Sequence, residues 1–162
     1  MSDGGTTQWL DDDEMRFWRT FVITATLLES RLNHDLNETQ GISHSDYTIL
    51  VFLSEAPDQK LRMSTLAELM ASSKSRLSHQ VARMEKAGLV TRQECDSDGR
   101  GVLAVMLPEG RELLERAAPT HVTGVRRHVI SRLSRAEQTA FADALERIQR
   151  GLSGDDEVAA AS

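Results

Sequence analysis

Apolar residues recur every three or four positions along most of this chain, which is the spacing of amphipathic helices. The first such stretch runs from Asp11 to Asn37. Asp11 is suited to cap its start, and the next three residues are carboxylates that the helix dipole favours. The apolar positions are Trp18, Phe21, Val22, Ala25, Leu28, Leu32 and Leu36. The pattern predicts one long helix that ends before Gly41, since glycine commonly stops a helix.

Three shorter helices are predicted next. Ser43 is expected to start the first, which continues to Leu53 and is broken by the sequence Ala56-Pro57-Asp58. Ser64 is expected to cap the second, with Leu66, Ala67 and Met70 facing inward. Ser72 or Ser73 is expected to cap the third, which ends at Gly88 and has Leu77, Val81 and Met84 on one face. Only residues 71–73 separate the last two helices, a length typical of a helix-turn-helix.

The second half of the chain begins with two predicted strands, Leu89 to Glu94 and Val102 to Met106, joined by a polar segment that contains glycine. This pattern favours a β-hairpin, the wing of a winged helix. A long helix is then expected from Pro108, kinked at Pro119, with apolar positions Leu114, Ala118, Val122, Val125, Val129 and Leu133. Ser134 and Glu137 form a capping-box pattern for a last helix, whose apolar positions are Phe141, Leu145 and Ile148. The fold class is therefore mainly α, with six helices and a small β-hairpin wing.

Length and composition exclude several classes of protein. A chain of 162 residues fits a single domain, expected at residues 11–150 between a flexible start (1–10) and a disordered, acidic tail (151–162). The single Cys95 excludes an intrachain disulfide and a cysteine-rich zinc site, and it favours a reducing compartment. Neither an export signal nor a membrane-spanning segment is expected, so the predicted location is the cytoplasm.

The net charge of −6 argues at first against binding to nucleic acid. Its distribution is uneven, with net −8 over residues 1–59, +3 over 60–100 and −1 over 101–162. Local charge facing the phosphates determines affinity for the DNA backbone, and the basic segment contains the predicted helix-turn-helix and hairpin. A solvated surface of mixed charge is the alternative explanation.

The predicted helix from Ser73 to Ala87 separates its residues into two faces. At 100° per residue, the apolar residues fall together, and the other side is polar and basic. Arginine there is suited to bond guanine in the major groove, and serine or histidine to bond base edges or phosphate. The candidate contacts on this helix are Ser73, Lys74, Ser75, Arg76, Ser78, His79 and Arg83, with Lys86 on the same face. An ordinary surface helix would show the same pattern. The hairpin that follows is therefore needed to distinguish a DNA-binding helix from such a surface helix.

The tip of that hairpin carries Asp98 and Arg100. An arginine at a narrow tip is suited to enter a minor groove, where the negative potential is strongest. Asp98 is suited to orient the guanidinium through a charge-assisted hydrogen bond. Asp-Gly turns are common in hairpins, so this motif alone is weak evidence for DNA binding. Together with the helix-turn-helix before it, the motif becomes strong evidence.

These residues resemble the MarR family of winged-helix transcriptional regulators, over nearly the whole chain. The family's wing pattern is similar to Asp98-Gly99-Arg100 and to Leu107-Pro108-Glu109-Gly110, with Pro108 in place of the usual threonine. The stretch from Ser73 to Val90 resembles the family's recognition helix and its continuation into the wing.

The resemblance implies an entwined homodimer that binds a pseudo-palindromic operator in double-stranded DNA. Dimerisation helices are expected at residues 11–40 and 108–150, and a DNA-binding lobe at 43–107. Apolar residues around most of one turn near Phe17 and Ile23 also favour a partner surface. The resemblance further implies a bacterial repressor, released by a small aromatic or anionic effector between the two lobes, with activation as the alternative mode of regulation. Trp18 and Tyr47 are candidate ligand contacts, although aromatic residues more often pack in a core.

Several alternatives remain open from the sequence. A redox role for Cys95 is disfavoured because Glu94 and Asp96 oppose a lowered thiol pKa. His121 and His128 lie about 10.5 Å apart along a helix, too far to bind one metal ion together, and His34 or His44 would join a site only through tertiary contact. No cofactor is expected. No nucleophile elbow, phosphate loop or metal motif supports an enzyme. A dimeric ligand-binding or interaction module without DNA binding is the remaining rival.

Overall fold

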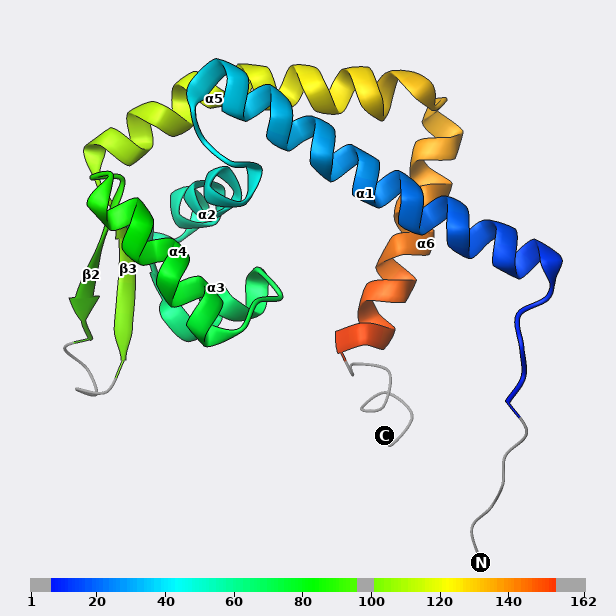
Figure 1. The fold of residues 1–162 in the computed structure, drawn as a ribbon, viewed down its shortest axis with the longest axis horizontal. Coiled ribbons are helices and arrows are strands. Elements are labelled where there is room, and N and C mark those ends of the chain that lie inside the picture. The colour runs from blue at the N-terminus through cyan, green and yellow to red at the C-terminus, as the bar shows by residue number, and fades with distance from the viewer. Residues whose placement is uncertain (1–6, 96–100, 154–162) are drawn as a thin grey trace, which may run out of the picture. The chain divides into compact units, whose positions relative to one another are not determined.

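A computed structural model describes residues 7–95 and 101–153 of the chain (Figure 1). Within these residues there are six α-helices and one small antiparallel sheet, which confirms the predicted fold class. The elements in chain order are α1 (Asp12–Gln40), α2 (His44–Glu55), η1 (Pro57–Gln59), β1 (Lys60–Arg62), α3 (Met63–Leu69), α4 (Lys74–Lys86), β2 (Val90–Glu94), β3 (Val102–Met106), α5 (Pro108–His128), η2 (Ile130–Arg132) and α6 (Arg135–Ser153). By contacts the chain divides into two compact units after His121.

The long first helix begins and ends as the sequence predicts. Asp11 accepts a hydrogen bond from the backbone N–H of Glu14, and the Glu14 carboxylate accepts one from the N–H of Asp11. This reciprocal capping box satisfies two backbone donors that the first turn leaves unpaired. At the other end Gly41 adopts a left-handed conformation (φ 66°) and donates to the carbonyl of Asn37. Glycine takes this conformation without steric cost, so α1 stops there.

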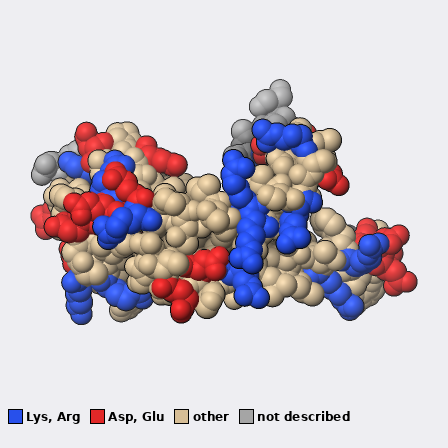
Figure 2. Space-filling model, turned by 90° about the horizontal axis from the view of Figure 1, so that it is seen from above, with Lys and Arg blue, Asp and Glu red and all other residues tan. Residues whose placement is uncertain are grey.

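Many of the apolar side chains of α1 are exposed rather than packed. Leu32 and Leu36 are buried near the end of the helix, whereas several large apolar residues toward its start lie in solvent. These residues are Phe17, Trp18, Val22, Ile23 and Leu27, each at least 39% exposed. Figure 2 shows red Asp and Glu side chains at the right-hand end of the molecule, over the first turn of α1. The start of α1 therefore combines an acidic end with an uncovered apolar surface.

The third helix begins differently from the prediction. Ser64 does not cap α3, which starts one residue earlier at Met63 and has no side-chain cap. The residues before it form β1, a three-residue strand that the sequence pattern does not predict. Lys60–Arg62 is too short to show a hydrophobic alternation, and it becomes a strand because β3 supplies the pairing partner. The predicted cap of α4 is confirmed at Ser73, whose hydroxyl accepts from the N–H of Arg76 at 3.2 Å.

The three strands form a sheet in the order β1-β3-β2. Pairing of β2 with β3 runs from Val90 opposite Met106 to Glu94 opposite Val102, which confirms the predicted hairpin strands. Both Val90 and Met106 are buried, and they attach the base of the sheet to the core. The tip of the hairpin, residues 96–100, lies outside the described residues.

The core of the first unit joins the helix-turn-helix to the sheet and to α5. Leu50 and Leu53 of α2, Leu66 of α3 and Val81 of α4 are fully buried. Leu114 and Ala117, on α5, complete the same cluster. One side of α4 packs against this core, so its other side is accessible to solvent or to a ligand.

The second unit contains the end of α5, η2 and α6. The helix predicted to continue to Leu133 ends instead at His128, because Val129 leaves the helical conformation (φ −123°, ψ −67°). Ser134 and Glu137 form the predicted capping interaction, with the Ser134 N–H donating to the Glu137 carboxylate at 2.8 Å. α6 then continues to Ser153, with Phe141 and Ile148 both exposed. Among the described residues, no helix is both long and apolar enough to cross a membrane.

Candidate nucleic-acid interface

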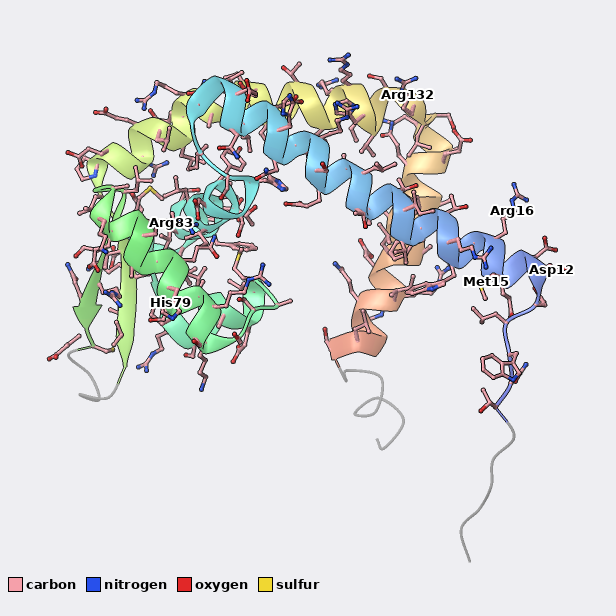
Figure 3. All side chains as sticks on the ribbon, viewed as in Figure 1. Asp12, Met15, Arg16, His79, Arg83 and Arg132 are labelled. Atoms are coloured by element: carbon pink, nitrogen blue, oxygen red, sulfur yellow. The ribbon has the colours of Figure 1, made fainter. Side chains whose placement is uncertain are left out.

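Helix α4 presents a basic face opposite the face that packs into the core. Leu77, Val81 and Met84 are at most 2% exposed, as the sequence predicts. The exposed side carries Lys74, Ser75, Arg76, His79, Arg83 and Lys86, while Ser78 is half-buried at the edge. Figure 3 labels His79 and Arg83, which lie on α4 one turn apart. The 13 residues of this helix contain four Lys or Arg and a single Glu, so its free face is electropositive.

The turn before α4 holds the helix in place with a strained residue. Ala71 has a positive φ of 45°, a conformation that is unfavourable for residues other than glycine. The N–H groups of Ala71 and Ser72 donate to the carbonyls of Glu68 and Ala67, at 2.9 Å each. These hydrogen bonds close the end of α3 and let α4 begin two residues later at the Ser73 cap. The tight turn therefore sets the direction in which α4 leaves α3.

The start of α2 contacts the exposed face of α4. The Asp46 carboxylate accepts from Nη2 of Arg83 at 3.0 Å and from Nε2 of Gln80 at 2.8 Å. The Ser45 hydroxyl also accepts from Gln80, at 2.6 Å. From the sequence, Arg83 is predicted as a DNA contact, but its partner Asp46 is not. No sequence signal was available, because 37 residues separate the two side chains.

The end of α4 is tied to the wing by an ion pair between Glu85 and Arg92. Arg92 donates from Nη2 and Nε to one Glu85 oxygen, at 2.8 and 3.0 Å, and its backbone N–H donates to the other. These hydrogen bonds, first from the backbone and then from the guanidinium, lower the pKa of the Glu85 carboxyl below its usual 4.5. The pair fixes strand β2 relative to α4, so the wing extends from a defined position.

A basic hollow of about 300 Å³ lies between the start of α3, the start of α4 and the strands of the wing near residues 101 and 102. Its lining includes the hydroxyl groups of Ser64 and Ser78. It also includes three cationic side chains, those of Arg62, Lys74 and Arg92. Of the three cations, only Lys74 is predicted as a DNA contact from the sequence. Arg62 and Arg92 come from strands on either side of β3, so only the sheet order brings them to one place. Such a set of cations and hydroxyls is suited to an oxyanion such as phosphate.

The predicted wing contacts, Asp98 and Arg100, lie outside the described residues. Next to the tip, the described strands are joined by a hydrogen bond from the Cys95 N–H to the Gly101 carbonyl, at 2.8 Å. The Cys95 side chain is buried, and Nη2 of Arg62 lies 3.5 Å from its sulfur.

The two predicted ligand contacts lie in different surroundings. Tyr47 is 5% exposed, and burial raises the pKa of its phenol above the usual 10.0. Trp18 is 52% exposed on α1 and packs beside Phe21, with ring centroids 6.2 Å apart. Two residues of α1, Glu29 and Asn33, contact His44 of α2 through their side chains. Trp18 lies 11 residues before the nearer of them, Glu29, which is about 16 Å along the helix. The first unit therefore does not bring Trp18 and Tyr47 together.

Tyr47 instead belongs to a cluster with two histidines. His44 on α2 places its Nε2 atom 3.2 Å from Nε2 of His121 on α5, and its Nδ1 atom 2.7 Å from the Glu29 carboxylate. The rings of Tyr47 and His121 have centroids 4.7 Å apart. Burial and the neighbouring His44 lower the pKa of His121, and Glu29 opposes this effect. Among residues 7–95 and 101–153, no three His, Cys, Asp or Glu side chains are arranged to hold a metal ion.

Comparison with known proteins agrees with this geometry. A sequence model of the MarR family matches residues 40–101. The structure is similar to AbsC, a MarR family transcriptional regulator from Streptomyces coelicolor, with 45% identity, a TM-score of 0.86, and coverage of 91% of this chain and 99% of that one. It is similar to Sco3205, a MarR family regulator from the same organism solved in complex with DNA, with 42% identity, a TM-score of 0.87, and coverage of 90% and 92%.

A curated relative adds to these two structures. The transcriptional repressor MprA of Escherichia coli K12 is 27% identical over 126 residues, which are 78% of this chain and 68% of MprA. These likenesses confirm the predicted regulator class over the enzyme class. The two structural likenesses each cover nine tenths of this chain or more. The chain belongs to the MarR family of transcriptional regulators.

Proposed function

We propose that this protein is a sequence-specific repressor that binds a pseudo-palindromic operator as a homodimer. The observation that carries the proposal is the division of α4 into a buried apolar face and an exposed basic face, on a helix attached to the core by Leu77, Val81 and Met84. A helix of this kind fits the major groove of B-DNA. Sco3205, which was solved in complex with DNA, supports the proposal by its similarity over most of the chain.

In this proposal, Arg76, His79 and Arg83 face base edges, since they project from the exposed side of α4. The residues at the start of the helix are assigned to backbone phosphates, namely Ser73, Lys74, Ser75 and Ser78. The basic hollow beside them adds Arg62 and Arg92 as phosphate contacts, because these cations lie at the same edge as Lys74. Arg100 is assigned to the minor groove and Asp98 to its orientation, both from the sequence pattern.

The exposed apolar surface of α1 supports the homodimer. Phe17, Trp18 and Ile23 are all more than half exposed, and Val122, Phe141 and Leu152 add apolar surface on α5 and α6. Soluble proteins seldom leave so many large apolar side chains uncovered unless a partner packs on them. A second copy of the chain would cover them and place the two recognition helices about one DNA turn, roughly 34 Å, apart.

We further propose that a small aromatic or anionic effector weakens DNA binding. Tyr47 and Trp18 are the candidate contacts for this effector. Tyr47 lies beside His44 and His121, where polar ring nitrogens meet an aromatic surface. Because Trp18 lies far along α1 from the residues that contact α2, an effector bound at Tyr47 would contact Trp18 only if that tryptophan came from the partner chain of a dimer.

The test is a binding titration of the full chain against its own upstream intergenic DNA and a scrambled duplex, at two salt concentrations. Specific binding predicts a preference for the first duplex and a steep loss of affinity as salt rises, because cations on the protein displace counterions from DNA. Arg100→Ala is expected to weaken specific binding without changing the dimer. A protein that binds neither duplex at low salt would favour a ligand-binding module of the same fold.

A further inference from the structure

The first turn of α2 holds one of the proposed base-reading residues of α4. Nη2 of Arg83 lies 3.0 Å from Oδ1 and 3.2 Å from Oδ2 of Asp46. The two side chains differ in environment, since that of Asp46 is 13% exposed and that of Arg83 is 66% exposed. A partly buried carboxylate thus holds the nearer end of a guanidinium that otherwise lies in solvent.

The carboxylate is itself held in place from several directions. The backbone N–H of Asp46 donates to the Ser43 hydroxyl that caps α2. The side chain of Gln80 donates through Nε2 to both Ser45 and Asp46. Because an ionised carboxylate only accepts hydrogen bonds, Asp46 also sets the orientation of the Gln80 amide, with Nε2 toward α2. Asp46 therefore orients the side chains of Gln80 and Arg83 on α4.

The contact leaves the guanidinium able to recognise DNA. Arginine has five N–H donors on three nitrogens, and Asp46 engages only Nη2. Among the described residues, neither Nη1 nor Nε of Arg83 makes a hydrogen bond. Ser45, Arg76, His79, Gln80 and Arg83 line an open hollow of about 350 Å³, so these free donors border accessible space. Ordering a long side chain before binding reduces the entropy lost when it meets its partner.

We propose that Asp46 is a positioning residue that fixes Arg83 for recognition of one base pair. The inference rests on the proposed function, because it assumes that Arg83 reads a base. Asp46 does not contribute attraction to DNA, since its charge has the same sign as the phosphates. Its effect lies in discrimination between base pairs, because a bidentate arginine contact depends on the direction of the fork.

The experiment begins with selection of binding sites by the full wild-type chain from a randomised double-stranded DNA library. The dissociation constants of single-base variants of the selected site are then measured. Arg83→Ala identifies the base pair at which discrimination depends on Arg83. The measured quantity is the ratio of affinities for the best and worst base pair at that position.

Asp46→Asn is expected to lower this ratio about fivefold or more, as a bidentate contact provides roughly 5- to 150-fold discrimination. Binding to a scrambled duplex is expected to be unchanged or tighter, because a negative charge near DNA is removed. Asp46→Glu, which keeps the carboxylate, is expected to recover part of the discrimination. Glu115→Gln is the matched control, because it removes the same charge from an exposed position on α5 and is expected to leave the ratio unchanged.

The inference is overturned if Asp46→Asn keeps the wild-type ratio, or if it lowers the ratio equally in the Arg83→Ala background. Wild-type protein that selects no sequence would overturn the proposed function as well, so the two failures are distinguishable. If Asp46→Asn does not fold, Arg83→Lys replaces it, since this exposed position tolerates a cation without the planar fork. Wild-type discrimination by Arg83→Lys would equally overturn the inference.

Discussion

Replacing Gly110 with alanine is expected to destabilise the protein, although alanine is the better helix former. Gly110 is buried in the first turn of α5, directly after the sheet. A Cβ atom at this position would overlap the backbone carbonyl oxygen of Leu89. It would also lie 3.1 Å from the Leu89 carbonyl carbon and 3.3 Å from Cδ2 of Leu50. The obstacle is backbone and buried core rather than a flexible side chain, so α5 must move away.

The magnitude follows from three contributions. Overpacking of a core contact costs about 1–3 kcal/mol. The movement also weakens the hydrogen bond from the Leu107 N–H to the Leu89 carbonyl, now 3.0 Å, which contributes about 1 kcal/mol. Alanine gains about 1 kcal/mol over glycine in helix propensity. The free energy of unfolding is therefore expected to fall by about 1–3 kcal/mol, and Tm by about 2–12 °C.

The assay is urea denaturation followed by circular dichroism, at one fixed protein concentration because a dimer is expected. Gly41→Ala is the control for conformational strain alone, since Gly41 has a φ of 66° but nothing within 4 Å of a new Cβ atom. It is expected to cost about 1 kcal/mol. Equal or higher stability of Gly110→Ala would refute the reasoning, because propensity would then outweigh the close approach of α5 to Leu89.

Three other perturbations have defined outcomes. Ala71→Gly is expected to raise the free energy of unfolding by about 0.5–1 kcal/mol, as relief of the left-handed strain exceeds the added entropy of the unfolded chain; an unchanged denaturation midpoint would contradict this. The pKa of His121 is lowered in the folded protein, so the unfolded chain binds a proton at this residue at a higher pH than the folded chain does. The free energy of unfolding should therefore fall as the pH is lowered from 7 through 6.5. His121→Gln should flatten that pH dependence in thermal melts, whereas His34→Gln, at an exposed site, should not. Ile23→Glu, at a side chain that is 58% exposed on α1, should shift the molar mass by light scattering toward the monomer; a retained dimer would place the interface elsewhere.

Much of the fold could be predicted from local sequence because the signals are local. The capping box at Asp11, the Ser73 cap, and the spacing of Leu77, Val81 and Met84 each act within one helix. Hydrophobic periodicity reports which face is buried without knowledge of what covers it. The errors also have local causes. Ser64 resembled a cap although β1 leads directly into α3, and the helix expected to reach Leu133 ends at His128 despite continued apolar spacing.

By itself, then, the sequence determined the helices, the hairpin strands and the basic face of α4, since periodicity, capping and charge are encoded within a few residues. Tertiary structure alone decided which side chains meet. It paired Asp46 with Arg83 and His44 with His121, and it brought Arg62 and Arg92 to the lining of one hollow. It also separated Trp18 from Tyr47 in one chain. The physical reason is that these contacts join residues tens of positions apart, whose distances depend on the packing of whole helices and on the order of strands in the sheet.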